Sequence, residues 1–184
     1  MRKLLLIPLF GVLFLPASCT DREKTPCDVI LEVEWTGTTQ IYFNIAVGQP
    51  PTITTFNLYN KMKNPNASGG TLDDVATTQY RVKWTRSDGG TVAPQEFDQA
   101  MTLRIPAGAS TTVSDLPLML WSQMAELPLI NLLPENGGLD PETGKNKIVC
   151  TAEVQFFGHT MNGCDLSSEK FYLYYTFYYT PLGR

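Results

Sequence analysis

The chain has 184 residues, a formal net charge of −4, 43% hydrophobic residues and 17% charged residues. This is the composition of an ordinary globular protein, so an intrinsically disordered chain and a collagen-like repeat are excluded. The negative charge also argues against a nucleic-acid partner, which would need a basic surface. The length suits one compact domain with a sizeable core.

The first residues have the layout of a secretory signal peptide. Arg2 and Lys3 supply a positive start, residues 4–15 form an apolar run, and small residues lead to Cys19. The run is shorter than the ~20 apolar residues that a transmembrane helix needs. The sequence therefore predicts a signal peptide over residues 1–18.

Residues 15–19, with the sequence Leu-Pro-Ala-Ser-Cys, resemble the lipobox of bacterial lipoproteins. In that family the signal peptide is cut just before the cysteine, and the cysteine thiol carries lipid. The resemblance implies a lipid such as palmitate on Cys19 and a polar tether over residues 19–26. Thr20, rather than Asp, follows the cysteine, which implies the outer membrane, on either its periplasmic or its outer side. The alternative is an ordinary secreted protein in which Cys19 is incidental.

From residue 28 onward, apolar and polar residues alternate in short segments, which is the pattern of strands with one buried face. The predicted strands span residues 28–35, 40–47, 52–59, 79–86, 97–105, 110–113, 147–157 and 171–179. The first two strands are expected to form a hairpin, and so are the last two. In the second strand the residues expected to face inward are Ile41, Phe43, Ile45 and Val47.

One stretch does not alternate and has helical spacing instead. Leu116, Leu120 and Met124 recur at intervals of four, and Asp115 stands where a helix cap would. Pro117 falls in the first turn, where proline is tolerated. The sequence predicts a short helix over residues 116–126.

About eight strands joined by turn-forming residues predict an all-β fold, an antiparallel β-sandwich. The pattern over residues 27–180 resembles the immunoglobulin-like sandwiches of bacterial envelope proteins. We therefore expect a single immunoglobulin-like domain over residues 27–184. This resemblance covers the fold and specifies no activity.

The cysteines offer a test of that expectation. Exported proteins meet an oxidising compartment, so a disulfide is allowed. A strand between Cys150 and Cys164 would separate them by roughly 26 Å, which disfavours their pairing. In immunoglobulin-like sandwiches the first strand begins near the end where the last hairpin turns. The resemblance therefore implies a Cys27–Cys164 disulfide, with Cys150 buried and free.

Catalytic and metal chemistry find little support in the sequence. The single histidine, His159, is interpreted as a surface-loop residue, because it has no partners at metal-ligand or triad spacing. Three carboxylate pairs could serve a hydrolase, namely Asp73 with Asp74, Glu96 with Asp98, and Asp140 with Glu142. The loop 140–146 has oxygens at alternate positions, but Lys145 makes a turn the better interpretation than a calcium site. No cofactor and no metal are predicted.

The last predicted strand has an unusual outward face. Where charged residues are typical, it carries Tyr172, Tyr174 and Tyr178. Tyrosine combines apolar area with a polar tip and is frequent in recognition surfaces. The three are predicted to contact a partner, unless the segment 115–146 folds over them.

Together these features predict a non-enzymatic envelope lipoprotein that binds or scaffolds at the outer membrane. The expected partners are the membrane, through Cys19, and another envelope protein or a glycan. One alternative is a fimbrial or adhesin subunit that exchanges its terminal strand, residues 170–184, between copies. Another is a hydrolase acting on glycan or peptidoglycan through a carboxylate pair.

Overall fold

The structure is a computed structural model that describes residues 27–182. The predicted signal peptide (1–18), Cys19 with the tether (19–26), and the last two residues of the chain lie outside the described residues. Among residues 27–182, no helix is long and apolar enough to cross a membrane.

The described residues form nine strands and a few short helical turns. The strands are β1 (Val29–Glu34), β2 (Gln40–Asn44), β3 (Thr52–Met62), β4 (Val75–Arg86), β5 (Phe97–Ile105), β6 (Ser110–Pro117), β7 (Lys147–Thr160), β8 (Asp165–Ser167) and β9 (Phe171–Tyr178). The helical elements are α1 (Trp121–Met124) and the 3-10 helices η2 (Ile45–Val47), η3 (Thr71–Asp73), η4 (Leu129–Leu132) and η5 (Pro134–Asn136).

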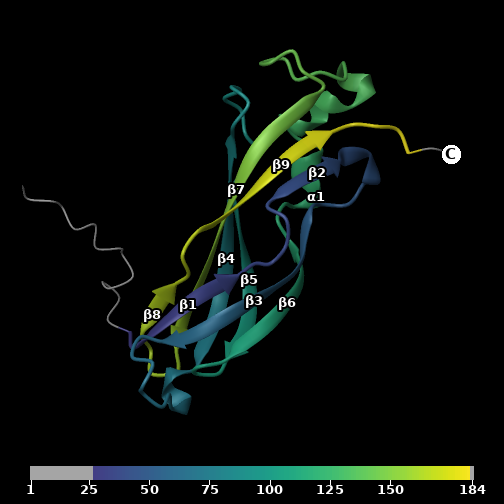
Figure 1. Ribbon diagram of the computed structural model, residues 1–184. Helices are drawn as coiled ribbons and strands as arrows, with labels where there is room; N and C mark the ends of the chain where they lie inside the picture. The colour runs from purple at the N-terminus through teal and green to yellow at the C-terminus, as the bar shows by residue number, and fades with distance from the viewer. Residues whose placement is uncertain (1–26, 183–184) are drawn as a thin grey trace, which may run out of the picture.

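Two sheets make up the all-β sandwich that the sequence predicts. The larger sheet has the order β2-β9-β7-β4-β5, with β8 paired to β7, and the smaller has the order β1-β3-β6 (Figure 1). The predicted hairpin of the last two long strands is confirmed as β7 and β9.

The alternation of apolar and polar residues along the strands explains which side chains form the core. Every second residue of β7, from Ile148 to Phe156, is fully buried, and Tyr80, Val82 and Trp84 of β4 are buried as well. These side chains lie on the inner face of the larger sheet and form one continuous apolar core with Leu31 and Leu58 of the smaller sheet. A strand whose period of two matches the pleat can bury one whole face in this way.

The predicted first hairpin is wrong. β1 pairs antiparallel with β3, whereas β2 joins the other sheet and runs parallel to β9. Both strands have one apolar face, and alternation cannot say which sheet that face belongs to. Val47 is also not inward but 49% exposed, because η2 replaces the period of two with a period of three.

The predicted helix over residues 116–126 is largely wrong. Leu116 and Pro117 complete β6, where Leu116 pairs with Ile53, and only Trp121–Met124 is α-helical. Leu116 therefore belongs to the end of a strand, Leu120 to the N-terminal cap of α1 and Met124 to α1 itself. Leu116 is buried by the sheet, while Leu120 is exposed.

The register defines two ends of the sandwich. At the disulfide end, Val29 lies opposite Met62 and Val75 opposite Thr160. At the loop end, Thr52 lies opposite Pro117 and Arg86 opposite Cys150. The loop end carries the connections 45–51, 87–96 and 118–146, the last of which includes the green helical turns at the top of Figure 1.

Candidate binding site

The face predicted from the sequence is open in the structure. Tyr172 and Tyr174 of β9 are 44% and 47% exposed, while the alternate residues Tyr175 and Phe177 are buried. Burial raises the pKa of Tyr175 above its usual range. Tyr178 also points outward by alternation but is half-buried.

Sequence reasoning missed a fourth member of this face. Tyr42 of β2 is 72% exposed and lies opposite Thr176 in the parallel register with β9. It is therefore a diagonal neighbour of both Tyr174 and Tyr178, at roughly 7–8 Å along the sheet. We call Tyr42, Tyr172, Tyr174 and Tyr178 the tyrosine face. Its outward position followed from alternation, but its place beside β9 depends on a parallel pairing that no local pattern encodes.

Polar groups of β7 border the tyrosine face. Glu153 lies opposite Tyr172, and Thr151 lies opposite Tyr174. The Lys170 ammonium lies 2.8 Å from the Glu153 carboxylate, and this hydrogen bond raises the pKa of Lys170. An apolar and aromatic centre with a charged border is the usual anatomy of a protein-binding surface.

The segment 118–146 covers the opposite, inner face of the larger sheet. Leu118, Met119, Leu129 and Leu132 of this segment are buried in the same core as Trp84. The alternative in which this segment hides Tyr172 and Tyr174 is therefore wrong. The smaller sheet covers only part of the larger one, and the segment covers the part nearer the loop end (Figure 1).

Arg86 fixes this segment in place. Its side chain is only 1% exposed, at the end of β4 on the inward side. The guanidinium donates two hydrogen bonds to Asp88, at 2.7 and 2.9 Å, and one to Asp140, at 2.8 Å. A fourth goes to the Val92 carbonyl at 3.1 Å. Nearly all of its donors are thus satisfied, as a buried charge requires.

Both carboxylates of this network are held in the ionised form. Burial acts to raise the pKa of Asp88, but hydrogen bonds from Arg86 and from the Val149 and Gly90 amides outweigh it, giving about 2. For Asp140 the effect of burial is likewise outweighed, by Arg86 and Thr143, and its pKa is lowered. The network therefore joins the 87–96 and 118–146 connections through charge.

Each carboxylate pair considered for hydrolysis is tied to an arginine. Asp74 binds Arg104 at 2.6 Å and accepts a hydrogen bond from the Ala107 amide. The amide and the guanidinium lower its pKa. A general acid in a glycosidase instead needs a raised pKa. The hydrolase hypothesis gains no support at this pair.

The other two pairs are organised in the same manner. Arg81 lies 3.2 Å from Glu96 and 2.8 Å from Asp98. Glu142 accepts hydrogen bonds from the Thr91 hydroxyl and from the Thr91 and Val92 amides, which lower its pKa.

The loop 140–146 uses its oxygens for internal contacts. The Asp140 carboxylate accepts hydrogen bonds from Arg86 and from Thr143. Within residues 27–182, no cluster of three or more His, Cys, Asp or Glu side chains could hold a metal ion.

The cysteines pair as the sequence predicts. Cys27 and Cys164 form a disulfide, with 5.7 Å between their Cα atoms, and Cys150 is free and buried. Burial raises the pKa of Cys150 to about 12, so its thiol is not a ready nucleophile. His159 is not in a loop, because β7 extends to Thr160 and pairs His159 with Ala76 and Asp165.

The strand-exchange hypothesis concerns β9, which lies between β2 and β7 and not at a free edge. Leu173, Tyr175 and Phe177 of β9 belong to the core. Exchange of residues 170–184 would therefore have to rebuild that core in the partner copy.

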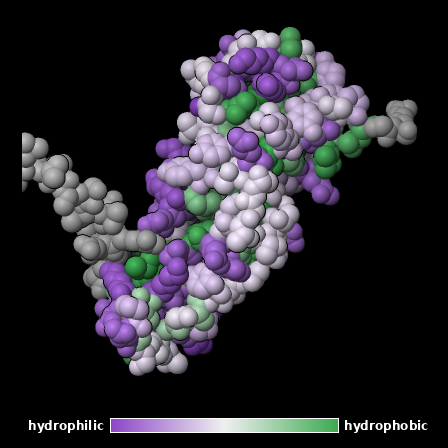
Figure 2. Space-filling view, viewed as in Figure 1, coloured by the Kyte–Doolittle hydropathy of each residue, from purple (hydrophilic) through white to green (hydrophobic). Residues whose placement is uncertain are grey.

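Further apolar side chains are exposed at the loop end and were not singled out from the sequence. They come from three separate connections and are Val47, Val92, Leu120, Trp121, Leu127 and Leu139. In the view of Figure 2, hydrophobic residues are exposed near this end, among hydrophilic ones. None of the three connections is apolar enough on its own to predict this surface from the sequence.

No protein-family model matches the chain, and no curated protein sequence matches it.

Proposed function

We propose that this protein is a lipid-anchored envelope lipoprotein of the outer membrane that binds a partner protein and has no catalytic role. The observation that carries the proposal is the tyrosine face. Tyr42, Tyr172 and Tyr174 are exposed together on one open sheet surface. An outward sheet face without such a role typically carries charged and small polar residues.

The position of Cys19 in the chain gives the orientation that we expect for the domain on the membrane. Lipid on Cys19 would leave residues 20–26 between the membrane and Cys27. Seven extended residues span at most about 25 Å. The disulfide end would then lie near the membrane, and the loop end would point away from it.

The chemistry of the surface favours a protein as the partner. Tyrosine rings supply contact area at low entropic cost, and the Glu153–Lys170 pair offers charge at the border. Asp74, Asp140 and Glu142 have lowered pKa values, whereas a general acid needs a raised one, which favours binding over hydrolysis at these residues.

The test is a cross-linked pull-down from intact envelopes. The wild type is compared with a triple variant carrying Tyr42→Ser, Tyr172→Ser and Tyr174→Ser, after circular dichroism shows that both fold. Trp121→Ser is the matched control, because Trp121 is an exposed aromatic residue outside the tyrosine face.

We expect a protein that is captured by the wild type and the control and lost from the triple variant. The same set of captured proteins in all three samples would contradict the proposal. Loss of a glycan instead of a protein would contradict the assigned partner class.

A further inference from the structure

We propose that the free edge of β5 is a self-association surface, through which two copies of this chain join their larger sheets by antiparallel β5–β5′ pairing. This surface is separate from the tyrosine face and does not depend on its function. The partner at this edge is a second copy, for the reasons that follow.

The β5 edge is long and unpaired among the described residues. β5 has nine residues, is the last strand of its sheet, and pairs only with β4. It contains no proline or lysine, which many natural edge strands use to prevent pairing. It does carry the charged residues Asp98 and Arg104 and a register irregularity against β4 opposite Thr77 and Gln79. The opposite edge of the same sheet, β2, has five residues and ends directly in η2.

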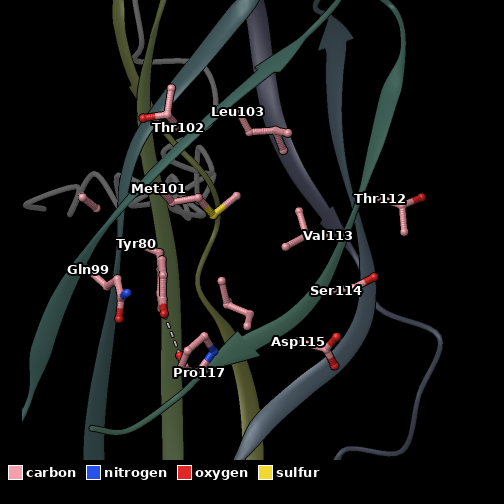
Figure 3. A pocket seen from close by; sticks show the side chains of 12 residues that line it. Tyr80, Gln99, Met101, Thr102, Leu103, Thr112, Val113, Ser114, Asp115 and Pro117 are labelled. Atoms are coloured by element: carbon pink, nitrogen blue, oxygen red, sulfur yellow. Dashed lines mark hydrogen bonds between the residues drawn. The ribbon is translucent and has the colours of Figure 1, made fainter.

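Beside this edge the sandwich is open. A cleft of about 300 Å³ lies between β5 and β6, lined by residues that include Tyr80, Met101, Leu103 and Val113. Figure 3 shows Met101, Leu103 and Val113 directed into the space between the strands. The Tyr80 hydroxyl donates a hydrogen bond of 2.7 Å to the Pro117 carbonyl. Met101 and Leu103 would be buried in a closed sandwich but are only half-buried here.

The backbone of β5 directs its free groups outward. The Thr77 hydroxyl donates to the carbonyls of Met101 and Leu103, so these two carbonyls point toward β4. Neighbouring residues of a strand point their backbone groups to opposite sides, so those of Thr102 and Arg104 point to the open edge. The β4–β5 register shifts opposite residues 100–103. Side-chain burial nevertheless alternates without a break from Phe97 to Ile105, which extends the outward orientation to residues 98 and 100.

The charges on the outer face of β5 are self-complementary. The exposed residues in order are Asp98, Ala100, Thr102 and Arg104. Antiparallel pairing about a two-fold axis at Met101 uses the whole strand and places Asp98 opposite Arg104 of the second copy. Within its own chain Asp98 already binds Arg81 at 2.8 Å and Arg104 binds Asp74 at 2.6 Å, so the new contacts would extend these ion pairs. Opposite charges directly across a strand pair stabilise it, and a two-fold axis forms the contact twice.

The same register also brings the apolar side chains on the inner face of β5 together with those of the second copy. Met101 meets its own copy in a non-hydrogen-bonded pair, and Gln99 meets Leu103. The half-buried Met101 and Leu103 would then pack against a second copy at the mouth of the cleft. The outward backbone groups of residues 98, 100, 102 and 104 are the ones that this register joins.

Disulfide trapping tests the register in membranes from cells that make the full-length chain. Non-hydrogen-bonded pairs place Cα atoms about 4.5 Å apart, which a disulfide can bridge. Met101→Cys is therefore expected to give a covalent dimer on mild oxidation. Gln99→Cys alone is the control, because its two copies would lie about 13 Å apart along the strands.

A second part of the trapping experiment does not involve a substitution at Met101. Co-expressed Gln99→Cys and Leu103→Cys chains are expected to cross-link to each other. Thr102→Pro, added to Met101→Cys, is expected to reduce the dimer at least tenfold, because proline removes an outward amide without removing an internal bond.

Three outcomes would overturn the proposal. One is no covalent dimer from either arm. Another is an equal dimer yield from Gln99→Cys alone, which would indicate random collision. The third is a cross-link from Met101→Cys to a different protein in place of the dimer, which would assign the edge to another partner.

Discussion

The two ends of the sandwich are closed by different forces. At the disulfide end, the Cys27–Cys164 bond joins the residues before β1 to the turn after β7. At the loop end, a buried guanidinium joins the β4–β5 connection to the β6–β7 segment through Asp88 and Asp140. A covalent bond is indifferent to pH and sensitive to reductant, whereas a buried ion pair has the opposite sensitivities.

The largest expected effect is at the loop end. Arg86→Met leaves the Asp88 and Asp140 carboxylates buried without their cation, and breaking such a pair costs about 3–5 kcal/mol of unfolding free energy. Urea unfolding at pH 7 measures the loss. Arg81→Met is the matched control, because Arg81 and its carboxylate partners are more than 40% exposed. A loss no larger than that of the control would contradict the structural role of Arg86.

The next effect is at the disulfide end. Cys27→Ala with Cys164→Ala opens a covalent loop with a sequence separation of 137, and removal of such a bond typically costs about 2–4 kcal/mol. Reductant should lower the stability of the wild type and leave that of the double variant unchanged. Equal sensitivity of both proteins to reductant would mean that the bond is not formed.

Acid should weaken the loop end by protonating its buried carboxylates. The folded pKa of Asp88 lies near 2, below its usual 3.8, so its contribution is complete above pH 4 and is lost as the pH falls toward 2. This depression corresponds to on the order of 2 kcal/mol. Urea unfolding between pH 7 and 2 should show a shallower pH dependence for Asp88→Asn than for the wild type. The disulfide variant should keep the wild-type pH dependence, and a change in it would mean that the two ends are coupled.

The smallest effect concerns Cys150, which stabilises neither end. Its thiol is fully buried and its pKa is raised to about 12, so a thiol reagent at pH 8 should leave it unmodified in the folded protein. Modification should follow at once when urea unfolds the chain. Rapid labelling of the native protein, located by peptide mass spectrometry, would contradict the burial of this strand position.

Local pattern was enough to predict most of the strands and the sandwich. Periods of two located the segments later seen as β1, β5, β7 and β9 to within a few residues. The parallel β2–β9 pair was not predictable, because alternation specifies a buried face and not a neighbour. The end of β6 was mistaken for a helix because its apolar residues happen to recur at intervals of four.

The disulfide and the Arg86 network also differed in how well they could be predicted from the sequence. Cysteines are few, so spacing and the sandwich resemblance sufficed to pair Cys27 with Cys164. Arginines and aspartates are common, and nothing local distinguishes Arg86 from Arg81 or Arg104. For the candidate site, Tyr172 and Tyr174 followed from one strand alone, while Tyr42 required the fold.

The most direct test of the proposed function is photocross-linking in intact cells. A photoreactive phenylalanine analogue is placed at Tyr174 in one full-length protein and at Thr112 in another. Thr112 is an exposed position in the smaller sheet. The account predicts a discrete cross-linked protein from position 174 and none of that mass from position 112. No product from position 174, or the same product from both positions, would contradict the role of the tyrosine face.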